Sequence, residues 1–364
     1  MRIIFCGGGS AGHINPALAI AEEMKMRDPK CEILFIGREG GFENGIVKKA
    51  GIPIKCVKIS GIQRRFTVKN IKNILAAIDA VKKAKEIIRE FRADAVVGTG
   101  GYVSWPVIRA AQMMNIPTVI HESNCSPGLT TKLLAKKCTR VLLNHAETAN
   151  ELKRNDNIQV IGNPMRQDFT KLSRGEARQK LNIKKDEIYI LSFGGSLGAE
   201  KLNDTVISIM KDESASDREI RHLHATGKRY YEKNEGTRFK NKKKKIVPYI
   251  ENMPLHLSAA DIVICRSGAV TLSEIALVGV ASILIPSPNV TDNHQYKNAK
   301  VISDSGACEL IEEKELTKEL LNNKIEALAN DETKRDTMAK KVKKFALPNS
   351  SKLAAENIIS VTRQ

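Results

Sequence analysis

The sequence lacks the features that mark a secreted, disulfide-bonded or membrane-spanning protein. Its seven cysteines are an odd, scattered set without a C-x-x-C pair, at positions 6, 31, 56, 125, 138, 265 and 308. That pattern argues against a disulfide framework or a zinc site and favours a reducing compartment. The apolar stretch after Met1 is too short for a signal peptide. The longest apolar run, 276–285, is well short of the roughly 20 residues of a membrane helix. These absences predict a cytoplasmic protein.

Two further absences narrow the chemistry. No Asp-x-Asp motif occurs, so we expect no metal bound through that motif. Aromatic residues make up 4% of the chain and none interrupts the lysine run 242–245. A nucleic-acid binder would interleave aromatic and basic residues, so nucleic acid is not expected as a partner.

Positive charge is in excess. The chain has 364 residues with 59 Lys and Arg against 41 Asp and Glu, a net charge of +18. Residues 1–163 hold 25 basic and 14 acidic residues, which is +11, and the excess is densest at 64–92. Such a bias is typical of proteins that meet an anionic membrane or substrate, although a solvated basic surface explains most single lysines equally well.

Strands alternate with helices along the whole chain, which indicates doubly wound parallel sheets. In the first half, strands are predicted at 3–6, 32–37, 54–59, 95–98, 118–121, 141–143 and 158–164. The pattern then restarts, with strands at 188–193, 220–225, 245–247, 261–265 and 281–285. We therefore expect two similar α/β domains, one of 1–163 plus a returning C-terminal segment 345–364, and one of 164–344.

A strand that turns through glycine into a helix lies at 261–278. Ser267 and Gly268 occupy the predicted turn, and the helix is predicted from Leu272 to Val278. Unpaired amides and the positive helix end suit a phosphate there, and Glu274 is placed to accept hydrogen bonds from sugar hydroxyls. The pattern predicts a nucleotide-sugar diphosphate site. An ordinary strand-loop-helix turn is the alternative.

The first glycine loop, Gly7-x-Gly9-x-x-Gly12, fits the dinucleotide fingerprint. The second strand, however, ends at Arg38 without the acidic residue that would hold a ribose, which leaves only a phosphorylated cofactor open. His13 follows the loop at a helix N-terminus, where the dipole favours a neutral imidazole that can act as a general base. A capping or packing role is the alternative for His13.

Polar residues follow other strands of the first half. Because strand ends converge at the carboxyl edge of a doubly wound sheet, His13, Tyr102, Glu122 and Asn124 are expected to face one cleft. Glu122 is also a candidate for a simple loop cap. The helix predicted at 69–91 has an apolar stripe of Ile71, Ile74, Leu75, Ile78 and Val81, which usually marks core. Its lysines, with Trp105, alternatively form a patch for anionic lipid.

Seven motifs in order resemble the MurG family of bacterial glycosyltransferases over about residues 3–300. They lie at 8–13, 100–104, 121–124, 162–166, 194–199, 265–269 and 294–296. The resemblance implies a GT-B fold, in which two Rossmann-like doubly wound parallel-sheet domains face a cleft. The second glycine loop of the chain is 98–101 and the third is 194–199. Two positions depart from the family pattern, Trp105 before Pro106 and Leu197 in the third glycine loop.

The resemblance also implies the site residues. The donor UDP-N-acetylglucosamine would be contacted by Ser10, Ala11, Gly12, Asn124, Arg166, Ser196, Ile250, Ala269, Val270, Thr271, Leu272, Ser273, Glu274 and Gln295. The acceptor pocket would include His13, Tyr102 and Glu122, with His13 the first choice of catalytic base and Glu122 the second. No cofactor and no metal are implied.

The implied reaction is an inverting hexosyl transfer (class EC 2.4.1) to undecaprenyl-diphospho-N-acetylmuramoyl-pentapeptide in peptidoglycan synthesis. The partners implied are the donor, the lipid acceptor, an anionic membrane surface and other cell-wall synthesis proteins, with the enzyme peripheral on the cytoplasmic face of the cell membrane. Three rivals stay open: another GT-B enzyme such as a UDP-sugar epimerase, a nicotinamide-dependent oxidoreductase, and a basic scaffold protein.

Overall fold

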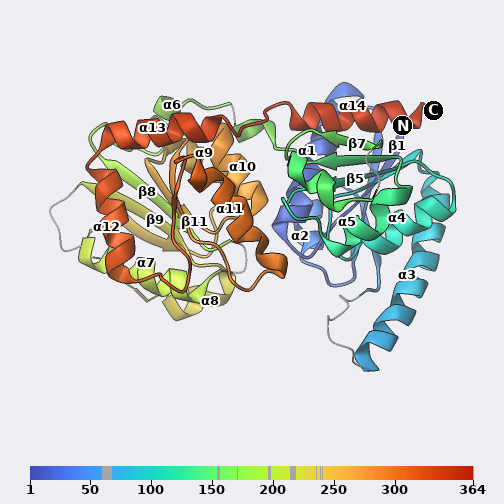
Figure 1. The fold of residues 1–364 in the computed structure, drawn as a ribbon, viewed down its shortest axis with the longest axis horizontal. Coiled ribbons are helices and arrows are strands. Elements are labelled where there is room, and N and C mark those ends of the chain that lie inside the picture. Colours follow the sequence, from blue (N-terminus) through green and yellow to red (C-terminus); the bar gives the residue numbers. More distant parts are fainter. Residues whose placement is uncertain are drawn as a thin grey trace. The chain divides into compact units, whose positions relative to one another are not determined.

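The computed structural model describes residues 1–59, 68–153, 156–169, 171–195, 198–213, 219–234, 236–237, 239 and 241–363, with the side chains of 68–75 and 291 outside this description. The chain divides into two compact units (Figure 1). Unit 1 is Met1–Arg166 with Leu347–Gln364, and unit 2 is Gln167–Ala346. Unit 1 thus ends at residue 166, where the sequence suggested 163, and its returning segment begins at residue 347, where the sequence suggested 345.

Unit 1 is built on a parallel sheet of seven strands in the order β3-β2-β1-β4-β5-β6-β7. The strands are β1 (Arg2–Cys6), β2 (Glu32–Arg38), β3 (Ile54–Val57), β4 (Ala95–Gly98), β5 (Thr118–Glu122), β6 (Arg140–Leu143) and β7 (Ile158–Val160). The helices are α1 (Ala11–Arg27), α2 (Glu43–Lys49), α3 (Val68–Phe91), α4 (Ser104–Met113), α5 (Leu129–Leu134) and α14 (Ser350–Thr362). The strand order reverses between β1 and β4, which is where such sheets bind ligands.

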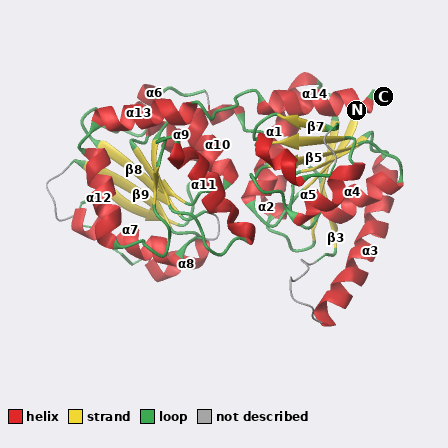
Figure 2. Ribbon diagram, viewed as in Figure 1, coloured by secondary structure: helices red, strands yellow, loops and turns green. Residues whose placement is uncertain are grey.

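Helices cover both faces of this sheet, so successive strand residues enter two different cores (Figure 2). Ile4 and Cys6 of β1 join the core made with α3, α4 and α5. Ile3 and Phe5 join the other core, made with α1 and α14. Burial on both faces explains why the strands read as continuous apolar runs in the sequence. The returning helix α14 packs on α1, whereas the sequence predicts only that the C-terminal segment returns to the first half.

Unit 2 repeats the architecture with a six-stranded parallel sheet in the order β10-β9-β8-β11-β12-β13. The strands are β8 (Ile188–Phe193), β9 (Ile220–Ala225), β10 (Lys244–Val247), β11 (Ile262–Cys265), β12 (Ala281–Leu284) and β13 (Glu309–Leu310). The helices are α6 (Arg174–Lys180), α7 (Glu200–Glu213), α8 (Lys228–Asn234), α9 (Met253–Ala259), α10 (Ala269–Val278), α11 (His294–Asp304), α12 (Lys318–Ala329) and α13 (Glu332–Lys343). Short 3₁₀ turns lie at Ala135–Lys137 and Ala146–Glu151 in unit 1, and at Gln167–Phe169 and Thr291–Asn293 in unit 2.

The buried face of α3 differs from the predicted stripe. Ile78 is 48% exposed, whereas Ala80, Ala84 and Ile88 are buried. Val81 packs at the edge of the core, and the side chains of residues 71, 74 and 75 lie outside the described part. Small alanines allow α3 to approach α4 closely, and a pattern of large apolar residues does not reveal such a face. Among the described residues, no helix is long and apolar enough to cross a membrane.

Candidate active site

Three loops meet at the carboxyl edge of the unit 1 sheet, because β1, β4 and β5 are neighbours there. Gly100 has φ +107°, and a Cβ on it would lie 2.5 Å from Nδ1 of His13. The imidazole of His13 therefore lies directly against the second glycine loop. Gly101 packs on the first loop so closely that a Cβ would lie 2.3 Å from the carbonyl oxygen of Gly8. These contacts require glycine, and they bring the first two glycine motifs together.

His13 lies in the first turn of α1, where its side chain is partly exposed. The Oγ1 of Thr99 donates to its backbone carbonyl at 2.6 Å, which ties the turn to β4. The ring of Tyr102 lies over Gly9, at 3.7 Å from the position of a Cβ there. His13 and Tyr102 thus lie on adjoining loops of unit 1.

Glu122 is a buried carboxylate that accepts four hydrogen bonds. Its Oε1 accepts from the backbone and side-chain amides of Asn124, both at 3.1 Å. Its Oε2 accepts from the Gly128 amide at 3.0 Å and from Thr131 Oγ1 at 2.7 Å. Because these donors already occupy both oxygens, the geometry favours Glu122 as a clamp on its loop over a role as proton acceptor. It also fixes the side-chain amide of Asn124.

His121, beside Glu122, is buried and neutral. Its Nε2 lies 3.0 Å from the carbonyl oxygen of Gly162, which assigns the proton to Nε2. Burial lowers the pKa of His121 to about 4, which prevents it from carrying a charge near neutral pH. His121 therefore supports the site without adding a cation.

In unit 2, the loop after β11 leads into α10 as the sequence predicts, but the helix begins at Ala269, three residues earlier than expected. Its N-cap is Gly268, which has no side chain to cap the first-turn amides. Ser267 is fully buried and donates to the backbone carbonyl of Gln295 at 2.9 Å, which ties this loop to the start of α11. The first-turn amides of α10 are suited to an anion.

Other predicted donor residues lie around the same edge of unit 2. Ile250 follows β10 and is 3% exposed, and Glu274 is 8% exposed on α10. The side chain of Gln295 accepts from the Ser287 amide at 2.9 Å through its Oε1. Ser196 and Leu197 lie outside the described residues. Ser10, Ala11, Gly12, Asn124 and Arg166 belong to unit 1, with Arg166 exposed at its boundary.

A buried hydrogen-bond chain links β8 and β9 to the third glycine loop, and sequence reasoning missed it. Ser192 Oγ lies 2.8 Å from both His222 Nε2 and His224 Nδ1, and His224 Nε2 lies 3.2 Å from Asn203 Oδ1. The Nδ2 of Asn203 donates to the carbonyl of Thr226 at 3.0 Å. All five residues are buried. In the sequence, the alternation of His222 and His224 along β9 is the signal of these hydrogen bonds.

These hydrogen bonds position Gly198, at the end of the third glycine loop. Because Asn203 donates to Thr226, its Oδ1 must accept, so His224 carries its proton on Nε2 and Ser192 donates to Nδ1. A Cβ on Gly198 would lie 2.2 Å from the Thr226 carbonyl oxygen, and Gly198 has φ +77°. Gly198 thus packs directly against the Thr226 carbonyl that Asn203 binds.

Acidification is expected to destabilise unit 2. Burial lowers the pKa of His224 from 6.5 to about 3. The unfolded chain therefore binds a proton that the folded chain does not, and stability falls as the pH drops from about 6.5 toward 3, by up to ~1.4 kcal/mol per pH unit for this group. Urea unfolding between pH 7.5 and 4.5 measures the slope. His224→Asn should flatten it, and an unchanged slope in that variant would contradict the assignment.

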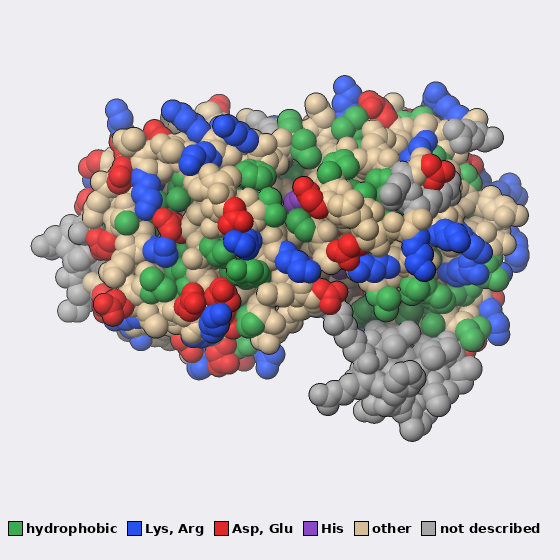
Figure 3. Space-filling model, in the orientation of Figure 1, with side chains coloured by type: hydrophobic (Ala, Val, Ile, Leu, Met, Phe, Trp, Pro, Cys, Tyr) green, Lys and Arg blue, Asp and Glu red, His purple; other side chains and the backbone are tan. Residues whose placement is uncertain are grey.

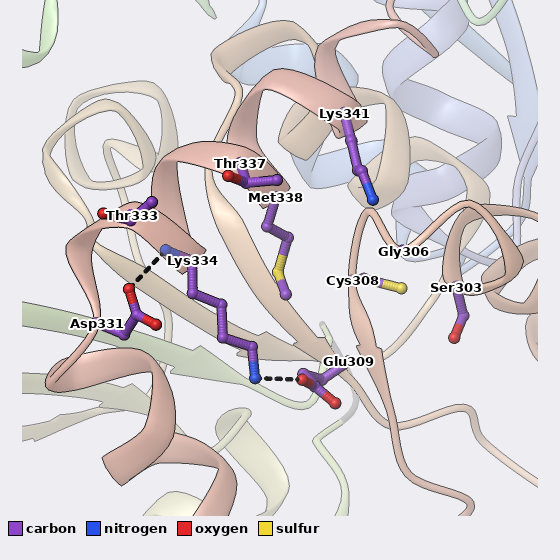
Figure 4. A pocket seen from close by; sticks show the side chains of 10 residues that line it. All are labelled: Ser303, Gly306, Cys308, Glu309, Asp331, Thr333, Lys334, Thr337, Met338 and Lys341. Carbon is purple, nitrogen blue, oxygen red and sulfur yellow. Dashed lines mark hydrogen bonds and ion pairs between the residues drawn. The ribbon is translucent and has the colours of Figure 1, made fainter.

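A cavity of about 560 Å³ also lies in unit 2, between the end of α11, β13 and α13 (Figure 4). Lys334 ion-pairs with Glu309 at 2.9 Å on its wall. Glu309 begins β13, so the cavity lies at the amino end of that strand, whereas the glycine loops follow the carboxyl ends. The cavity is therefore separate from the candidate donor site.

Comparison with known proteins agrees with this geometry. The N-terminal domain of glycosyltransferase family 28 matches residues 3–143 and its C-terminal domain matches residues 189–354. A crystal structure of Acinetobacter baumannii MurG is 27% identical with a TM-score of 0.77, covering 99% of both chains. The chain has two doubly wound units with glycine loops at the carboxyl edges of their sheets, and the two domains of the family match it in order. These features define a GT-B glycosyltransferase.

Curated relatives place the chain more narrowly. A UDP-N-acetylglucosamine–N-acetylmuramyl-(pentapeptide) pyrophosphoryl-undecaprenol N-acetylglucosamine transferase of Acetivibrio thermocellus is 40% identical, covering 100% of this chain and 99% of the relative. The enzyme of the same name from Halalkalibacterium halodurans is 39% identical, covering 96% and 97%. The chain belongs to this family of N-acetylglucosamine transferases, the MurG family.

Proposed function

We propose that the protein transfers N-acetylglucosamine from UDP-N-acetylglucosamine to the 4-hydroxyl of the muramoyl sugar of undecaprenyl-diphospho-N-acetylmuramoyl-pentapeptide. The observation that carries the proposal is the placement of His13 against Gly100 at the switch point of the unit 1 sheet, in a chain related over its full length to enzymes named for this transfer. Both the fold and the family agree with the proposal.

His13 is the proposed base. It removes the proton of the acceptor hydroxyl as that oxygen attacks the anomeric carbon of N-acetylglucosamine. The new C–O bond forms as the bond to the UDP oxygen breaks, which inverts the configuration and gives a β-1,4 link and free UDP. Partial exposure leaves the imidazole accessible to a substrate, and Tyr102 on the adjoining loop is proposed to line the acceptor pocket. Glu122 is the second candidate for the base.

Unit 2 is proposed to hold most of the donor. The uncapped first turn of α10 is suited to the diphosphate, and the leaving UDP gains negative charge that these amides stabilise. Ile250 is proposed to meet the uracil edge through its backbone, Glu274 the ribose and Gln295 the sugar hydroxyls. Ser10, Ala11, Gly12, Asn124, Arg166 and Ser196 remain proposed donor contacts on the family resemblance.

The membrane surface is a proposed partner of unit 1. Leu129 and Leu133 of α5 are 69% and 61% exposed, and Met113 of α4 is 52% exposed. Lys132 and Lys136 lie beside them in the sequence, and hydrophobic and basic side chains lie side by side on the face in Figure 3. Trp105, an expected member of such a patch, packs instead against the core. An apolar patch edged by lysines suits the anionic cytoplasmic leaflet, where the lipid acceptor would be presented.

Release of UDP tests the function directly. The protein is incubated with UDP-N-acetylglucosamine, with and without a short-chain analogue of the muramoyl-pentapeptide lipid, and UDP and the disaccharide product are measured. We expect release that depends on the acceptor and a β-linked product. Donor binding without acceptor-dependent release would instead point to another GT-B activity.

A further inference from the structure

Glu43 is a buried carboxylate enclosed by the first glycine loop and the turn after β2. It begins α2 and is 1% exposed. A Cβ on Gly8, Gly37 or Gly41 would lie within 2.4–2.9 Å of its side chain. Three glycines therefore leave the space that this one side chain fills. Substitution of any of them would displace it.

The carboxylate is bound to backbone amides. Its Oε1 accepts from the Arg38 amide at 2.8 Å, and its Oε2 accepts from the Gly9 amide at 3.4 Å. Gly9 has φ +84° and belongs to the fingerprint loop whose amides face a phosphate in dinucleotide-binding proteins. Here Glu43 supplies the anion for that amide from within the protein. The acidic residue that the sequence lacks at the end of β2 is thus provided five residues later and directed inward.

The loop held by Glu43 carries the proposed acceptor site. The side chain of Glu43 packs against Gly8 and accepts a hydrogen bond from the Gly9 amide. Against the same loop, Gly101 packs on the Gly8 carbonyl and the ring of Tyr102 lies near Gly9. The adjoining Gly100 contacts the imidazole of His13. A shift of the first loop would therefore move both residues relative to the acceptor, although Glu43 itself is too deeply buried to reach a substrate.

We propose that Glu43 is a positioning residue, whose carboxylate takes the place of a bound anion at the first glycine loop and thereby fixes His13 and Tyr102 for catalysis. This inference rests on the proposed function. It predicts a larger effect on turnover than on donor binding, because Ser10, Ala11 and Gly12 are the only proposed donor contacts on this loop and most of the others belong to unit 2. Small displacements of reacting groups are enough to reduce rates strongly.

The decisive variant is Glu43→Gln, which keeps the shape but places an amide group against a backbone N–H. We expect kcat to fall at least tenfold, with the KM for UDP-N-acetylglucosamine within threefold of the parent. Glu39→Gln is the matched control, since Glu39 is exposed four residues away and loses the same charge. A kcat for Glu43→Gln within threefold of that control would overturn the proposal, as would a donor KM that rises in proportion to the loss of kcat.

Chemical rescue provides a second measurement. Glu43→Ala leaves a space shaped for a carboxylate, and added formate should restore kcat at least fivefold in that variant but not in His13→Ala. No rescue in a folded Glu43→Ala protein would contradict the role of the carboxylate. An inactive parent would instead overturn the proposed function. The Gly9 amide then still tests Glu43, because its hydrogen exchange, followed by NMR, should accelerate in Glu43→Gln and not in Glu39→Gln.

Discussion

Replacement of His13 by alanine is expected to lower kcat by about 10²- to 10⁴-fold, the usual contribution of a positioned general base. The imidazole lies on Gly100 at the edge of the unit 1 sheet, and the hydrogen bond from Thr99 to the backbone carbonyl of residue 13 does not involve the replaced side chain. Steady-state kinetics with the lipid analogue measure the effect. Binding of UDP-N-acetylglucosamine, followed by calorimetry, should change by less than about threefold.

Glu122→Gln is the informative comparison for His13. The variant keeps the shape of the side chain but disturbs the acceptors for Asn124, Gly128 and Thr131, so we expect lower thermal stability and a smaller loss of kcat than in His13→Ala. Turnover of His13→Ala within threefold of the parent would show that His13 is not the base. A loss confined to Glu122→Gln would transfer that role to Glu122.

Asp261→Ala is expected to destabilise unit 2 by about 3–5 kcal/mol, the usual result of removing one partner of a buried ion pair. Asp261 is 4% exposed and binds Arg178 at 2.8 Å, and it also pairs with Arg174. Its Oδ2 accepts from the Tyr189 amide at 2.8 Å, which joins α6 to β8 and β11. The variant leaves the Arg178 cation buried without this partner. Urea unfolding monitored by circular dichroism measures the loss.

Asp304→Ala is the matched control for this experiment. Asp304 pairs with Lys300 at 2.8 Å on the exposed face of α11, with side chains 62% and 52% exposed. Exposed pairs of this kind contribute roughly 0–1 kcal/mol. If Asp261→Ala cost no more than Asp304→Ala, the buried cluster would not be a stabilising feature of unit 2.

The strands and the final helix were predictable because their burial leaves a direct mark on the sequence. β8 and β9 have the predicted bounds, since continuous apolar runs and a glycine exit define buried parallel strands, and α14 lies within the predicted returning segment 345–364. The start of α10 was predicted three residues late, because Ala269 and Val270 continue an apolar stretch without a capping side chain. The predicted apolar stripe of α3 was wrong at Ile78, which is exposed, because the buried face of this helix is formed largely by alanines.

The sequence by itself determined the parallel α/β architecture, the glycine loops after the strands and the residues that resemble the MurG family. Each of these depends on local spacing or on motifs in order. Only the tertiary structure decided how the side chains at those loops are used. Glu43 meets Gly9 across 34 positions, and Asn203 meets Thr226 across 23. Such contacts follow from the crossovers between strands, which bring distant residues to one sheet edge, and no local pattern records them.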